Sequence, residues 1–89
     1  MTKYDWQNGT HGADVATAAT LGETLFTMAL RLSQNAANRV EAHTYFNLAD
    51  GLGVAEAAYH RAAVAETMTK SEIGRALRSA RAWMVASAA

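Results

Sequence analysis

The chain is 89 residues long, 51% of them hydrophobic, and its eight acidic and eight basic side chains leave no net charge. Proline is absent and alanine is abundant, so one small all-α domain is expected. A neutral chain has no general electrostatic attraction to nucleic acid or an anionic membrane, and the lack of cysteine excludes disulfides and thiolate metal sites.

The first residues predict an arm rather than a targeting segment. Residues 1–12 are polar and contain two glycines near their end, which indicates a flexible arm before a single helical domain over residues 13–89. Its aromatic residues, Tyr4 and Trp6, are expected to dock on the helical body or on a partner. Neither a signal-peptide core nor a membrane-spanning apolar run is found, so we expect a cytoplasmic protein.

A first helix is predicted from about Ala13 or Asp14 to Ser33, with Asp14 as its N-cap. Phe26 and Ala29 widen a seam of large apolar residues that recur at alternating steps of three and four. The members of that seam are Leu21, Leu25, Met28 and Leu32. The simplest interpretation is that this seam is buried in the core of the domain. The alternative is that it mediates self-association with a second copy of the chain.

Two further helices follow a loop over residues 34–38. The second spans about residues 39–50 and ends at Gly51 and Gly53, because glycine adopts the left-handed conformation that closes a helix. The third covers about residues 54–67. The residues expected to face inward are Val40, Ala42, Tyr45 or Phe46, Ala49, Ala57, Ala58, Val64 and Met68.

The fourth helix starts at a capping box and runs to about Ala86. In this box Thr69 and Glu72 satisfy each other's backbone donors. Its inward residues are expected to be Ile73, Leu77, Ala80, and Met84 or Trp83. We expect Trp83 to be buried against Ile73, Met68 and the third helix.

The same helix carries three arginines at three-residue steps: Arg75, Arg78 and Arg81. A solvated outer face is the favoured interpretation. Contact with nucleic acid or with an acidic partner is the alternative, since basic stripes of this kind attract anionic surfaces.

One pattern covers the second half of the chain. Ala-His-x-aromatic-Phe-Asn-Leu-Ala occupies residues 42–49, Gly-x-Ala-Glu-Ala follows at 53–57, and a Met-Thr pair at 68–69 opens the last helix. Over Val40–Trp83 the chain resembles the Sel-one-like repeat family, a branch of the tetratricopeptide superfamily. The resemblance implies an all-α fold of four helices in tetratricopeptide-like hairpins, closed by a C-terminal capping helix. The first half departs from the family, because Leu30–Gln34 lacks the usual glycine loop.

The histidines are the obvious catalytic or metal-binding candidates. His43 stands at a framework position of the motif, where a packed side chain is expected. Glu56 and His60 are four residues apart and could hold a metal, although an exposed pair is the more common outcome. His11 is expected to be solvated. With no nucleophile or phosphate-loop motif, we expect no enzyme, no catalytic residue, no metal, no cofactor and no small-molecule substrate.

The expected function is therefore a protein–protein interaction module, or a small scaffold or accessory subunit of a larger complex. Helix one and its groove with helices two and three are expected to contact a protein partner or a second copy. The alternative is a small regulatory protein that contacts nucleic acid or an acidic partner through the basic C-terminal helix. The candidate partner-binding residues are Tyr4, Trp6, Leu21, Leu25, Met28, Leu32, Arg75, Arg78 and Arg81.

Overall fold

The computed structural model describes residues 10–88, and the side chains of residues 20–87. The secondary structure of this part of the chain is all helical, with four α-helices, one short 3-10 helix and no strand. The elements are α1 (Thr10–Leu32), η1 (Ala36–Asn38), α2 (Arg39–Gly51), α3 (Ala57–Ala65) and α4 (Lys70–Ala88). The all-α, four-helix expectation is confirmed.

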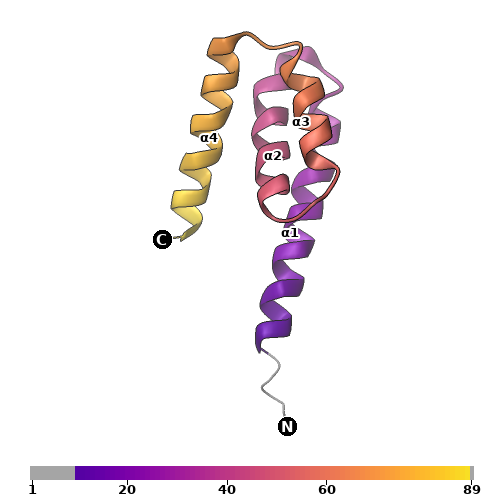
Figure 1. Ribbon diagram of the computed structural model, residues 1–89, viewed down its shortest axis with the longest axis vertical. Helices are drawn as coiled ribbons and strands as arrows, with labels where there is room; N and C mark the ends of the chain where they lie inside the picture. The colour runs from indigo at the N-terminus through magenta and orange to yellow at the C-terminus, as the bar shows by residue number, and fades with distance from the viewer. Residues whose placement is uncertain (1–9, 89) are drawn as a thin grey trace.

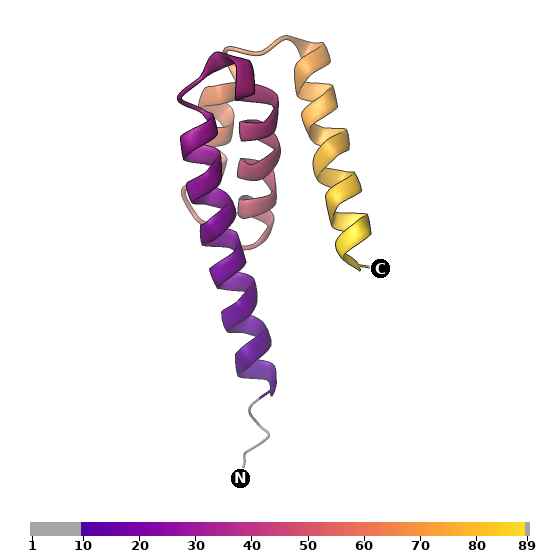
Figure 2. The ribbon, with the colours of Figure 1, turned by 180° about the vertical axis from the view of Figure 1, so that it is seen from behind.

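Helix α2 is the centre of the arrangement. It packs against α1, α3 and α4, and it lies between α4 on one side and the α1/α3 pair on the other (Figures 1 and 2). Consecutive helices run antiparallel, so α2 and α4 run side by side in the same direction. The N-terminal part of α1 extends beyond the loop that joins α2 to α3, which gives an elongated molecule of 53 × 24 × 16 Å.

The core is built from small residues and a few aromatic ones. One cluster joins all four helices and contains Leu25, Leu48, Ala49, Ala57 and Ala80. A second cluster at the α1–α2 contact contains Ala29, Ala42 and Phe46. The alanines let the helix backbones approach closely, while half-buried Phe26 and Tyr45 pack against both clusters and connect them.

Gly22 marks the closest approach of α1 to the loop after α2. It is buried, and a Cβ atom at this position would lie 3.1 Å from both the Leu52 Cβ and a Val54 methyl group. Any larger residue would therefore push the loop away from α1.

The predicted helix-end chemistry is present. The backbone N–H of Thr69 donates to the Glu72 carboxylate at 2.9 Å, and the N–H of Glu72 donates to the Thr69 hydroxyl oxygen at 3.1 Å. Gly53 has a φ of 94°, the left-handed conformation expected after the second helix. The two hydrogen bonds confirm the capping box, and the positive φ confirms the predicted left-handed glycine after α2.

Two predicted helix boundaries differ from the structure. Helix α1 begins at Thr10, so Asp14 lies inside the helix instead of at its N-cap, and the predicted end of the arm at residue 12 falls within α1. Helix α3 begins at Ala57, three residues later than predicted. The delay arises because the chain first makes a turn, in which the Val54 N–H donates to the Ala49 carbonyl and the Ala57 N–H donates to the Val54 carbonyl.

The apolar seams of α1 and α4 are only partly buried. On α1, Leu25 and Ala29 face α2, whereas Leu21 and Met28 lie to one side and are 38% and 39% exposed. On α4, Ala76 and Ala80 are buried against α2. Leu77, which was expected to face inward, is exposed because α4 packs chiefly on α2 alone. Of the two alternatives Met84 and Trp83, Trp83 is the one that packs on the core, and Met84 is exposed.

The predicted environment of Trp83 is wrong in part. Trp83 is half-buried and packs against the cluster that contains Leu48, at the end of α2, and Ala57, at the start of α3. Ile73 and Met68 are not part of that cluster. The parallel course of α2 and α4 explains this, since it brings the end of α4 to the end of α2. None of the described helices is long and apolar enough to span a bilayer.

Candidate interaction surface

The first uncovered surface is one flank of α1. Leu21 and Met28 are partly exposed there, and Met28 also lines a shallow groove of about 410 Å³ along the helix. The other lining residues are Thr20, Glu23, Thr24, Thr27 and Arg31. Leu25 is buried and Leu32 is half-buried against the core. Of the predicted α1 contact residues, only Leu21 and Met28 are well placed to meet a partner.

The second uncovered surface is on α4. Leu77, Met84 and Val85 are 41%, 58% and 66% exposed. Met84 also borders a small apolar pocket of about 80 Å³ that is lined by Leu48, Gly51, Leu52 and Trp83. Both end helices of the molecule therefore present large apolar side chains to solvent.

The three arginines of α4 lie on that exposed surface. Arg75, Arg78 and Arg81 are all exposed, and within residues 10–88 none of them makes an ion pair or hydrogen bond. The sequence predicted that these arginines lie on a solvated outer face of the helix, and all three are exposed to solvent.

The arginines of α2 and α3 make internal contacts. Arg39 on α2 pairs with Glu72 on α4 at 3.2 Å, which ties the N-terminal ends of these two helices together. The Thr69 backbone N–H, and then Arg39, hold the pKa of the Glu72 carboxyl below its usual value. Arg61 on α3 reaches α2, where it donates to Asn47 at 2.8 Å and to Asp50 at 3.0 Å.

His43 is a buried framework residue. Its side chain is 3% exposed, and its Nδ1 atom has no hydrogen-bond partner among the described residues. Burial, and secondly the positive charge of Arg61, lower the pKa of His43. The ring is therefore neutral near pH 7, and it packs as the sequence predicts.

The ring of His60 packs against aromatic side chains of the core. Its ring stacks on Phe46 and meets Phe26 edge-on, with centroids 5.5 Å and 5.3 Å apart. Glu56 is exposed, whereas His60 is half-buried, so the two residues do not form the exposed pair that was expected. No cluster of three potential metal ligands occurs in the described residues, and the side chain of His11 lies outside them.

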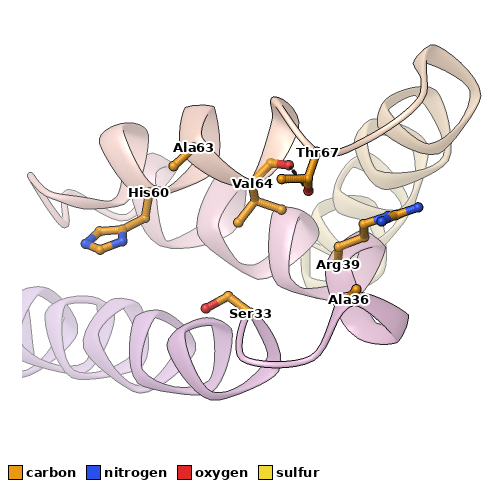
Figure 3. Close-up of a pocket in the computed structure, with 7 residues that line it drawn as sticks. All are labelled: Ser33, Ala36, Arg39, His60, Ala63, Val64 and Thr67. Atoms are coloured by element: carbon orange, nitrogen blue, oxygen red, sulfur yellow. Dashed lines mark hydrogen bonds between the residues drawn. The ribbon is translucent and has the colours of Figure 1, made fainter.

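A pocket of about 330 Å³ lies between the end of α1 and α3, in the region where a groove among the first three helices was predicted (Figure 3). It is lined by Ser33, Ala36, Arg39, His60, Ala63, Val64 and Thr67. The Thr67 hydroxyl donates to the Val64 carbonyl at 2.7 Å, and Arg39 is engaged by Glu72. The pocket offers few free polar groups for a ligand.

Comparison of the chain with protein-family models, curated proteins and solved structures gave no match. The resemblance to Sel-one-like repeats therefore stays a prediction from the motif at residues 42–57 and the helix that follows.

The structure changes the list of predicted contact residues. It leaves Leu21, Met28 and the three arginines accessible, and it places Leu25 in the core. Tyr4 and Trp6 lie outside the described residues. Sequence reasoning missed Leu77 as a surface residue and did not decide between Met84 and Trp83. The seven-residue spacing of Leu77 and Met84 indicated a second apolar stripe on this helix.

Proposed function

We propose that this protein is a non-enzymatic protein–protein interaction module, a small scaffold or accessory subunit. The observation that carries this proposal is the pair of uncovered helix faces on α1 and α4, each with large apolar side chains exposed to water. Such faces gain stability when a partner covers them, at about 25 cal/mol per Å² of apolar surface removed from water.

The arrangement of the helices supports this proposal. α1 and α4 both pack chiefly on α2, so each has a free side on which a further helix fits. Helical hairpins that bury only part of their apolar surface are the units from which stacked helical assemblies are built. A tetratricopeptide-like hairpin arrangement, with α4 as its capping helix, is our proposal for the fold family.

A second candidate function is contact with nucleic acid or an acidic partner through α4. The exposed arginines without ion pairs favour it. The neutral charge of the whole chain weighs against nucleic acid, because binding to a phosphate backbone depends on net positive charge over the contact surface. Contact with a protein surface is therefore the better supported function.

The test is capture of partners by the tagged full-length chain, either a second copy or another protein of the native cell. Leu21→Gln with Met28→Gln should lower the amount captured by about tenfold if the α1 flank is the contact, because two apolar anchors are lost. Tyr59→Gln is the matched control, since Tyr59 is 76% exposed on α3.

A chain that neither self-associates nor retains another protein would overturn the proposal. Equal loss of capture in the Tyr59→Gln control would also contradict it, because that residue lies outside both uncovered faces.

A further inference from the structure

We infer that residues 1–9 fold back along α1 and dock at the end of α2 and α4, with the ring of Tyr4 in the apolar pocket there and Trp6 beside it on α4. The contact is made within one copy of the chain, and it goes beyond the proposed function without depending on it. The pocket, the lengths of the helices and the sequence of residues 1–9 each support it.

The pocket lies where the last turn of α2 meets α4. It has a volume of about 80 Å³, and its lining residues are glycine or apolar: Leu48, Gly51, Leu52, Trp83 and Met84. Met84 is 58% exposed, so the apolar rim of the pocket is in contact with water. Covering such a surface is favourable, because burial of apolar area is the main driving force for contacts of this kind.

Helix α4 continues past the end of α2. The ion pair of Arg39 with Glu72 holds the two helices level at their first turns. From there α2 continues for 12 residues to Gly51 and α4 for 16 residues to Ala88, which is about 18 Å and about 24 Å at 1.5 Å per residue. The last turn of α4 therefore has no neighbour on α2.

Ser87 shows the consequence of this difference in length. Ala76, Ala80, Trp83 and Ser87 follow one another at steps of four, three and four, so they share the face of α4 that meets α2. The two alanines are buried, Trp83 is half-buried and Ser87 is exposed. The face that meets α2 is thus uncovered at its end, next to the pocket.

Helix α1 leads to the same place. A Cβ atom at Gly22 would lie 3.1 Å from the Cβ of Leu52, so the pocket is level with Gly22. Leu21 is 38% exposed and lies one turn before Leu25, on the face of α1 that meets the cluster of Leu48. The N-terminal part of α1 continues beyond this level, past the loop that joins α2 to α3 (Figures 1 and 2). A chain that returns along α1 from its first residue therefore arrives at the pocket.

The distance to the pocket matches the length of the segment. α1 begins at Thr10, 12 residues before Gly22, which is about 18 Å along the helix axis. Tyr4 stands six residues before Thr10, and six extended residues reach about 20 Å. Trp6 stands four residues before Thr10 and reaches about 13 Å, which falls short of the pocket but is close to the level of the last turn of α4. Tyr4 is therefore the aromatic residue that enters the pocket.

The sequence of residues 1–9 fits an extended chain that reverses before α1. Asn8–Gly9 directly precedes the helix, and Asn-Gly is the pair most favoured in tight turns, because both residues accept a positive φ. Before this pair, Tyr4 and Trp6 alternate with polar residues over residues 3–7. Successive side chains of an extended chain point to opposite faces, so the two aromatic rings share one face and the polar side chains share the other.

A tyrosine ring suits the chemistry of this pocket. At about 80 Å³, the pocket has about half the volume of an apolar cavity that holds a benzene molecule. A ring therefore enters it partway, and its hydroxyl group stays at the surface, where water satisfies it. The indole of Trp83 and the sulfur of Met84 are both favourable neighbours of an aromatic ring.

The docked segment leaves other apolar residues free for a partner. Met28 lies two turns beyond Leu21 on α1, and Leu77 lies two turns before Met84 on α4. The contact of residues 1–9 and the proposed interaction function can therefore fail separately.

The chain has no cysteine, so a pair of introduced cysteines tests the contact directly. Asp5→Cys lies between the two aromatic residues, and Ser87→Cys lies on the uncovered last turn of α4. With oxidised glutathione as the oxidant and full-length protein at about 1 µM, far below the effective concentration within one chain, a disulfide should form within single chains. Docking should make this at least about fivefold faster than for Asp5→Cys with Tyr59→Cys, because it raises the local concentration of the two thiols.

Tyr59 is the matched control position, because it lies in the first turn of α3 and is 76% exposed. Tyr4→Ala with Trp6→Ala, added to the Asp5→Cys and Ser87→Cys chain, should remove the difference in rate, since both aromatic anchors are lost. Circular dichroism should give the same helix content for all variants, because every changed residue either precedes α1 or is exposed.

A second measurement uses the fluorescence of Trp83. In the Trp6→Phe protein Trp83 is the single tryptophan, so acrylamide quenching reports its exposure. Adding Tyr4→Gln should raise the quenching constant and shift the emission to longer wavelength, because Trp83 loses its cover. Lys3→Gln is the matched control, since Lys3 lies on the other face of the extended segment, and it should change neither quantity.

Equal disulfide rates for the two cysteine pairs, or a rate that does not fall without the two aromatic residues, would overturn the docking. Disulfide-linked dimers as the main product would overturn it in favour of the same segment of a second copy. Trp83 emission that is the same with Tyr4 and with Gln at position 4 would also contradict it, because the ring would then lie outside the pocket. Capture of a partner through Met28 is independent of each of these results.

Discussion

The ring of His60 on α3 stacks on the ring of Phe46 on α2, with centroids 5.5 Å apart and planes 19° from parallel. Phe46 is the largest fully buried side chain among those described. The imidazole therefore contributes packing area at the junction of α1, α2 and α3, where it also meets Phe26.

His60→Ala should lower the free energy of unfolding by about 1–2 kcal/mol, since it removes a half-buried ring from an aromatic cluster. His60→Phe keeps the ring and should stay within about 1 kcal/mol of the parent. Denaturant melts measure both. A chelator should leave the melting temperature unchanged, and a clear drop would mean that His60 holds a metal after all.

Gly22→Ala should destabilise the fold by about 1 kcal/mol, even though alanine favours helices. The added methyl would lie 3.1 Å from Leu52 and Val54 in the loop after α2. Gly51→Ala is the control, because nothing lies within 4 Å of its Cβ position, and it should be neutral or stabilising. Thermal melts that show equal effects for the two substitutions would contradict the close contact at Gly22.

Stability should fall in acid because of His43. The folded state lowers the pKa of His43 from its ordinary value of 6.5, by burial first and by Arg61 second. The unfolded chain then binds the proton more tightly than the folded chain does. The contribution of His43 is complete above pH 6.5 and is lost as the pH falls toward the lower, folded-state pKa.

His43→Phe tests this prediction, because it keeps a ring, removes the titrating group and removes the buried Nδ1 that lacks a partner. The free energy of unfolding of the variant, measured from about pH 5 to pH 8, should decline less in acid than that of the parent. Parallel curves for the two proteins would show that His43 does not supply the pH dependence.

The capping box should be worth about 1 kcal/mol. Thr69→Ala removes the hydroxyl that accepts from the Glu72 N–H, whereas Thr69→Ser keeps an acceptor at the same place. Urea melts should separate the two variants, with the serine protein close to the parent. Identical midpoints for the alanine and serine variants would show that the capping box does not stabilise α4.

Trp83→Ala should cost about 2–3 kcal/mol, less than for a fully buried aromatic, since Trp83 is only half-buried. Val85→Ala on the same helix should change stability by less than about 0.5 kcal/mol, because Val85 is 66% exposed. A Trp83 effect as small as the Val85 effect would show that the end of α4 is not docked on α2.

The sequence by itself determined the helices and much of the chemistry at their ends. Four helices follow from apolar periodicity in a chain without proline, and the starts and stops at Gly53 and Thr69–Glu72 are local because their partners are within a few residues. The early start of α1 was missed, since polar residues such as Thr10 carry only a weak preference for or against a helix.

Only the tertiary structure decided which part of each apolar stripe is buried. An apolar stripe covers about a third of the surface of a helix. The position of the neighbouring helix decides which part of that stripe becomes buried. On α1 that selection favours Ala29 over Met28, and on α4 it favours Ala76 over Leu77. Alanine gives little hydrophobic signal in a sequence, yet it permits the closest approach of two backbones, so the residues left on the surface were the larger ones.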